Sequence, residues 1–75
     1  MTKDQFVAAI TGFTNPGPFS YYPQSVGGKT CYINQDGSMV AFIGSNCMWY
    51  QGTRTLALGN FQVVYDAMIN SGRYS

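Results

Sequence analysis

The hydrophobic pattern near the start of the chain has the spacing of a helix. Phe6, Ile10 and Phe13 recur at intervals of three and four residues, which places side chains on one side of a helix. Thr2 has a glutamine three residues after it, the spacing of a capping box that closes the first turn. The pattern predicts an amphipathic helix over about 3–12.

A second helical pattern lies near the other end of the chain. Asn60 can cap the start of a helix and Gly72 can end it, so the prediction covers about 60–71. Each helix has a single apolar side and is expected to pack against the rest of the domain through it. In the second helix the apolar side consists of Phe61, Val64, Tyr65, Met68 and Ile69.

Between the helices, the sequence predicts antiparallel strands. Asp36-Gly37 separates two apolar runs and is typical of a two-residue hairpin turn. This turn would pair Ile33 with Val40, and a second turn around Ser45-Asn46 would lead into the next strand. The strands are predicted over about 29–35, 38–43, 47–51 and 54–58.

The predicted register divides the strand residues between two faces of the sheet. Both helices would cover the face that carries Ile33, Val40, Phe42 and Trp49. The expected fold is a single α+β domain over 1–75, with an N-terminal helix, a three- to four-stranded antiparallel meander and a C-terminal helix. The opposite face would form an apolar patch that soluble monomers rarely leave bare. Its expected members are Tyr32, Met39, Ala41, Ile43, Met48 and Tyr50.

The segment 13–28 contains three prolines and several large aromatic side chains. Proline lacks an amide donor and has a fixed φ, so a helix or an inner strand is not expected there. Phe19, Tyr21 and Tyr22 would then lie in a loop. They would either fold back as a lid over the core or face a partner.

Low charge is the most informative feature of the composition. Charged residues make up 9% of the chain, against about a quarter in typical domains, and the formal net charge is +1. The four basic residues do not cluster, which argues against binding to duplex nucleic acid. The sequence shows neither a signal peptide nor a membrane span, so a cytoplasmic protein is expected.

The residues offer little for catalysis, cofactor binding or metal binding. The chain has no histidine and no glutamate, and its three aspartates are far apart in the predicted fold. Cys31 and Cys47 are expected to be reduced core residues on one face, two strands apart and too distant for a disulfide. The stretch Gly27 to Thr30 resembles the end of a phosphate-binding P-loop, but Pro23 stands where that motif requires its first glycine. No enzyme, cofactor or metal site is predicted.

These observations favour a non-enzymatic protein-binding module. Its surface would work by shape and hydrogen bonding, since it is rich in Tyr, Ser, Asn and Gly and poor in charge. Small modules of this kind are typical of viruses and mobile elements, so the hypothesis is an inhibitor that occludes a host protein or defence complex, as anti-CRISPR proteins do. The candidate contact residues are Phe19, Tyr21, Tyr22, Tyr32, Met39, Met48, Tyr50 and Arg54.

Two alternatives remain open. One is a structural, virion-type component that assembles with copies of itself, which low charge and a two-sided apolar sheet would favour. The other is a protein that sequesters a nucleotide or another small ligand. That function would need Tyr21, Tyr22 or Trp49 as a stacking platform beside Arg54 or Lys29.

Overall fold

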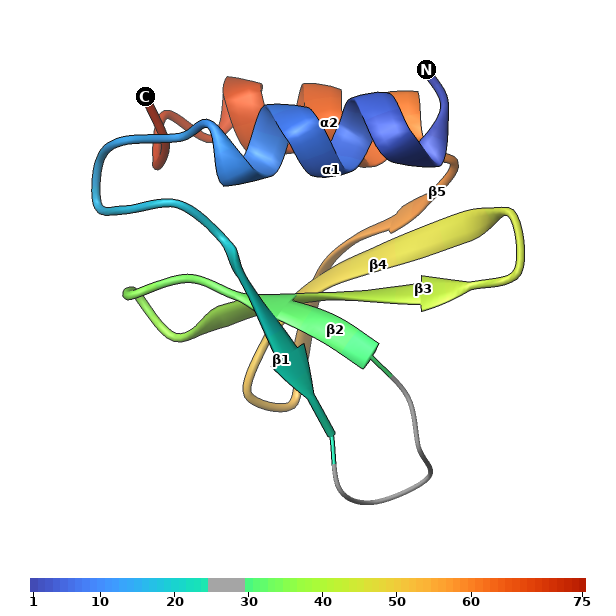
Figure 1. Cartoon of the computed structure of the whole chain (residues 1–75), viewed down its shortest axis with the longest axis horizontal. Helices are drawn as coiled ribbons and strands as arrows, with labels where there is room; N and C mark the ends of the chain where they lie inside the picture. The colour runs from blue at the N-terminus through green and yellow to red at the C-terminus, as the bar shows by residue number, and fades with distance from the viewer. Residues whose placement is uncertain (25–29) are drawn as a thin grey trace.

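Two helices lie side by side on one face of a five-stranded antiparallel sheet in the computed structural model, which describes residues 1–24 and 30–75 (Figure 1). The strands are neighbours in chain order, so the sheet is a meander, and the α+β prediction is confirmed. No helix in these residues is long and apolar enough to cross a membrane. The elements are α1 (Lys3–Thr11), β1 (Ser20–Pro23), β2 (Thr30–Ile33), β3 (Ser38–Ile43), β4 (Asn46–Gln51), β5 (Arg54–Gly59) and α2 (Phe61–Asn70).

Both helices begin where their capping residues predict. The Thr2 hydroxyl accepts a hydrogen bond from the Gln5 amide, and the Gln5 side chain accepts one from the Thr2 amide. In α2, the Asn60 side chain accepts a hydrogen bond from the Val63 amide at 2.9 Å. Local sequence therefore determines both helix starts.

The core lies between the helices and the sheet. Phe6 and Ile10 of α1 are fully buried there, and both belong to the predicted apolar side of the helix. The Phe6 ring packs 5.5 Å from the Phe61 ring of α2 and 6.4 Å from the Phe42 ring of β3. The other core residues are Phe13, Phe19, Val40, Cys47, Trp49, Val64, Met68 and Tyr74.

The sheet has one more strand than the sequence predicted. Ser20–Pro23, expected to be part of a loop, forms β1 and pairs with β2 from Ser20 opposite Ile33 to Pro23 opposite Thr30. The prolines did exclude an inner strand, but β1 is at the edge of the sheet, where a missing amide donor is tolerated. Tyr21 and Tyr22 therefore lie on regular strand backbone.

The first hairpin turn is also longer than predicted, by one residue. Asn34 pairs with Ser38 around a three-residue loop: the Asn34 amide donates to the Ser38 carbonyl and the Gly37 amide donates to the Asn34 carbonyl. Gly37 has a φ of 86°, the left-handed conformation that such a loop requires at its last position. Tyr32 consequently lies opposite Val40 rather than Ala41.

This shift of one residue exchanges the two faces of β2, because side chains alternate along a strand. Tyr32 is on the helix-covered face, whereas Cys31 and Ile33 are on the opposite one, which corrects the prediction for all three residues. In the second hairpin the two-residue loop is Gly44-Ser45, so Trp49 is opposite Val40 instead of Phe42. That shift of two residues leaves Trp49 on the predicted face.

Candidate functional site

The sheet face opposite the helices, called here the far face, has an uncharged surface. The registers place two complete rows of side chains across the five strands on this face, together with the pair Ile43 and Asn46. None of these strand residues carries a charge. One row is Tyr22, Cys31, Ala41, Met48 and Leu58, and the other is Ser20, Ile33, Met39, Tyr50 and Thr55.

Part of the far face is covered by its own side chains. Cys31 is fully buried although neither helix covers this face. The Gln24 side chain, just beyond β1, donates a hydrogen bond to the Tyr50 hydroxyl in β4 at 3.4 Å. The predicted contact residues Met39, Met48 and Tyr50 do lie together on this face and are half-buried. Ile43 and Leu58 are its most exposed apolar residues, at 52% and 60%.

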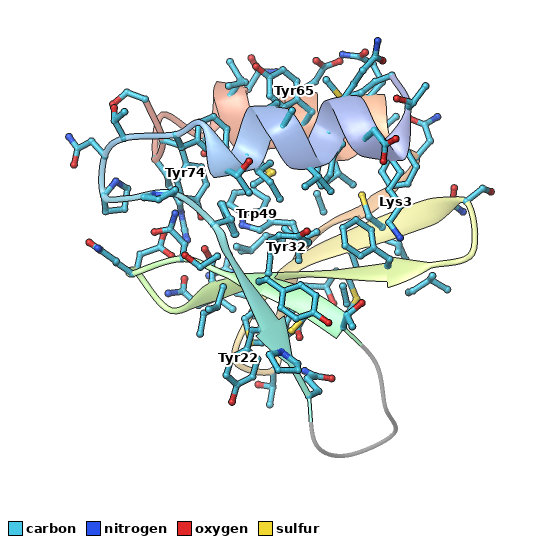
Figure 2. The ribbon with its side chains drawn as sticks, viewed as in Figure 1. Lys3, Tyr22, Tyr32, Trp49, Tyr65 and Tyr74 are labelled. Atoms are coloured by element: carbon cyan, nitrogen blue, oxygen red, sulfur yellow. The ribbon has the colours of Figure 1, made fainter. Side chains whose placement is uncertain are left out.

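Strand β1 presents two tyrosines on opposite sides. Tyr21 is 59% exposed and Tyr22 is 46% exposed, and in the register they face the helix-covered side and the far side respectively. Figure 2 shows Tyr22 on the side of the sheet away from the helices and Tyr32 on the helix side. The two rings are not a lid over the core, one of the roles the sequence left open.

Strand β1 is an edge of the described sheet, and the alternation of hydrogen bonds along antiparallel strands shows which of its backbone groups point outward. The Asn34 amide donates a hydrogen bond to β3. Because backbone groups on a strand point alternately to its two neighbours, the N–H and C=O groups of Tyr32 also point toward β3. The backbone groups of Ile33 and Cys31 then point toward β1. Their partners Ser20 and Tyr22 point back toward β2, and the N–H and C=O groups of Tyr21 point away from the sheet.

On the helix side, the sheet edge next to β1 carries a row of aromatic rings. Tyr21 packs edge-on against Tyr32 at 5.9 Å between ring centroids, and Tyr32 packs edge-on against Phe42 at 5.8 Å. The Lys3 ammonium group lies 4.6 Å from the centre of the Phe42 ring. This row connects the exposed Tyr21 ring to the hydrophobic core.

Phe19 and Arg54 do not join these surfaces. Phe19 is 1% exposed and packs against Phe13 and Tyr74, so its side chain belongs to the core, contrary to the contact role predicted for it. Arg54 is exposed at the start of β5, on the opposite edge of the sheet from β1, and lies opposite Gln51 on the helix-covered face.

The structure separates two members of the predicted small-ligand platform, Trp49 and Arg54, from the exposed tyrosines, and Lys29 lies outside the described residues. Trp49 is 3% exposed: the Arg73 guanidinium lies over its ring at 5.5 Å, and the Tyr74 ring packs edge-on at 5.9 Å between centroids. Arg54 is separated from Tyr21 by the width of the sheet. The glycines and the lysine of the P-loop-like stretch lie outside the described residues, and Thr30 begins a strand as expected.

A buried polar network was not predicted from the sequence. The Tyr74 hydroxyl lies 3.0 Å from the Asp36 carboxylate and within hydrogen-bonding distance of the Ser38 hydroxyl, and it accepts a hydrogen bond from the Trp49 indole N–H at 3.2 Å. The Asp36 carboxylate also accepts from the Ser38 amide and hydroxyl. Figure 2 shows Tyr74 and Trp49 between the helices and the sheet.

The network shifts the pKa values of two ionisable groups, Asp36 and Tyr74, in opposite directions. Partial burial raises the pKa of the Asp36 carboxyl, but hydrogen bonds from Ser38 and Tyr74 and the nearby Arg73 charge outweigh it, so the pKa is lowered overall. Burial is the main cause of the raised pKa of the Tyr74 hydroxyl, and the Asp36 charge adds to it. Asp36 is therefore ionised and Tyr74 neutral at pH 7, the states that suit a neutral donor and a charged acceptor.

The two cysteines are free, buried and on opposite faces of the sheet, which corrects their predicted shared face. Burial raises the pKa of Cys31, and it raises the pKa of Cys47 to about 11. Both thiols are therefore protonated at neutral pH, the weakly nucleophilic form. Across the described residues, no three metal-ligating His, Cys, Asp or Glu side chains come together.

Comparison of the chain with protein-family models, with curated protein sequences and with solved structures gives no match. The candidate surfaces therefore rest on their own geometry.

Proposed function

We propose that this chain is a non-enzymatic protein-binding module whose contact surface is strand β1 with Tyr21 and Tyr22. The observation that carries the proposal is the exposure of two adjacent tyrosines on an uncharged edge strand. Tyrosine combines a large apolar ring with a polar hydroxyl and is enriched at protein interfaces.

The geometry favours a partner that binds in an extended conformation. The outward N–H and C=O groups of Tyr21 can form a pair of hydrogen bonds with a strand that is added alongside β1. Pro23 has no N–H and limits the length of this pairing. The tyrosine rings, one on each side of the strand, would therefore supply much of the contact.

The partner segment is expected to be largely uncharged. The four residues of β1 carry no charge, so an acidic or basic segment would lose water without gaining an opposite charge there. Inhibition of a host protein or defence complex is one role such a module could serve. It would act by covering a protein surface, since Asp4, Asp36 and Asp66 do not form an acidic surface that could mimic nucleic acid.

The test is affinity capture with the tagged chain and the Tyr21→Ala/Tyr22→Ala variant, followed by identification of bound proteins by mass spectrometry. The matched control is Val63→Ala/Ile69→Ala, which removes two similarly exposed apolar side chains from α2. We expect a stoichiometric partner that is retained by the control and lost from the tyrosine variant. Retention of every partner by a folded tyrosine variant would contradict the proposal.

A further inference from the structure

We infer that the far face is a self-association surface, covered in solution by the far face of a second copy of this chain in a symmetric dimer. This inference concerns the face of the sheet, whereas the proposed function concerns the edge at β1; the Tyr22 side chain belongs to both surfaces. It rests on the charge, the side-chain composition and the size of the far face.

Charge is the first reason to favour a second copy. The described charged side chains lie elsewhere. Lys3, Asp4 and Asp66 are on the helices, Asp36 is in a hairpin turn, Arg54 begins β5 on the helix-covered face, and Arg73 follows α2 and lies over the Trp49 ring. Two far faces can therefore meet without burying an unpaired charge and without repulsion between like charges. The net charge of +1 also does little to keep two copies apart.

The side chains suit the packing of one sheet on another. Ala41 lies in the middle strand, β3, where a small residue lets two sheets approach closely. Ile33, Met39 and Met48 surround it and are half-buried, and Ile43 and Leu58 project further into solvent. Methionine side chains are flexible and fill irregular gaps, which helps two copies of one surface to fit together.

The size of the far face limits how tight the dimer can be. The sheet has two four-residue strands and three six-residue strands. With strands about 4.8 Å apart and about 3.3 Å per residue, the face covers on the order of 400 Å² in projection. Side chains make the accessible area of a face larger than its projection. Two such faces together would bury about 1,000 Å² of accessible surface, the lower end of the range for specific interfaces. We therefore expect a dimer that dissociates on dilution.

The test is the solution mass of the purified chain, measured by sedimentation equilibrium over the micromolar to millimolar range. The wild-type mass is expected to rise toward twice the 8.2 kDa of one chain as the concentration increases. Ile43→Lys/Leu58→Lys places two charges on the far face and should give 8.2 kDa throughout. Both substituted side chains are exposed, so the fold should accommodate them.

The control is Val63→Lys/Ile69→Lys, which makes the same change in charge at exposed positions of α2 and should dimerise like the wild type. If the far-face variant loses the native Trp49 fluorescence, Ile43→Ser/Leu58→Ser replaces it in the same measurement. A monomeric wild type, a far-face variant that still dimerises, or a control that also dissociates would overturn the inference. Partner capture is measured separately, and because Tyr22 also lies on the far face, Tyr21→Ala alone changes the β1 contact without changing the far face.

Discussion

Replacing Tyr74 by phenylalanine tests whether the buried polar network stabilises the fold. The substitution keeps the ring, which packs 5.2 Å from both Phe13 and Phe19, and removes only the hydroxyl. That hydroxyl contacts the Asp36 carboxylate and accepts the hydrogen bond of the Trp49 indole. The variant therefore isolates the polar contribution from the apolar one.

Two losses determine the size of the effect. A hydrogen bond to a charged group contributes about 1.5–3 kcal/mol, and a buried donor left without a partner costs about 1–3 kcal/mol. The Trp49 indole N–H, on a side chain that is almost fully buried, would be such a donor. Since part of the loss is recovered by relaxation, we expect Tyr74→Phe to lower the free energy of unfolding by about 2–4 kcal/mol. For a domain of this size, that corresponds to a fall in Tm on the order of 10–25 °C.

The assay is urea unfolding followed by the fluorescence of Trp49, the only tryptophan in the chain. Tyr65→Phe is the control, because Tyr65 also stacks on Phe13 but its hydroxyl has no hydrogen bond to any of the described residues. We expect the control to unfold within about 0.5 kcal/mol of the wild type. An equal effect of the two substitutions would refute a stabilising role for the Tyr74 hydroxyl.

The same network predicts how stability depends on pH. The pKa of Asp36 is lower in the folded chain than in the unfolded one, so on acidification the unfolded state takes up the proton first. The stabilisation is complete above the usual pKa range of an aspartate and is lost as pH falls through the lowered folded-state pKa. Tyr74→Phe removes one of the hydrogen bonds that lower this pKa and should make the acid-induced loss smaller. A steeper loss in the variant than in the wild type would contradict this explanation.

Three further predictions follow from the turn, β1 and the cysteines. Gly37→Ala should destabilise the chain by about 1–2 kcal/mol in urea unfolding, because φ is 86° there, although a methyl group would fit the space; an unchanged midpoint would contradict the three-residue turn. Tyr21→Ala/Tyr22→Ala should lower stability by only about 1 kcal/mol, since the main intramolecular loss is one edge-on ring contact, and a loss comparable to a core substitution would show that the rings act as a lid. Cys31 and Cys47 should react with a thiol reagent at pH 7 only as fast as the chain opens, because both are buried and protonated; rapid labelling of the native protein would show that a thiol is accessible.

The sequence predicts the elements whose signals are local. The α1 capping box and the apolar spacing of both helices place each within one residue of its observed bounds. The alternation of side chains along β3 and β4 likewise gives the correct faces for Val40, Trp49 and Met48, because the apolar pattern within each strand is enough to assign them. These features need no information from distant parts of the chain.

The errors arise where distant groups decide between local alternatives. Asp36-Gly37 suits a two-residue turn. The three-residue turn is favoured because the Asn34 amide donates to the Ser38 carbonyl and the Ser38 amide donates to the Asp36 carboxylate. The Asn34 side chain is held in turn by the Gly17 carbonyl, seventeen residues earlier. The position of Tyr74 next to Asp36 also has no local signal in the sequence.

The two sides of β1 place different demands on any segment that pairs with it. In an added strand, alternate side chains would continue the aromatic row of Tyr21, Tyr32 and Phe42, while the others would continue the row that begins with Tyr22. A segment that slips by one residue would exchange these two sets of neighbours. Binding through β1, as proposed, would therefore distinguish two segments of identical composition by the order of their residues.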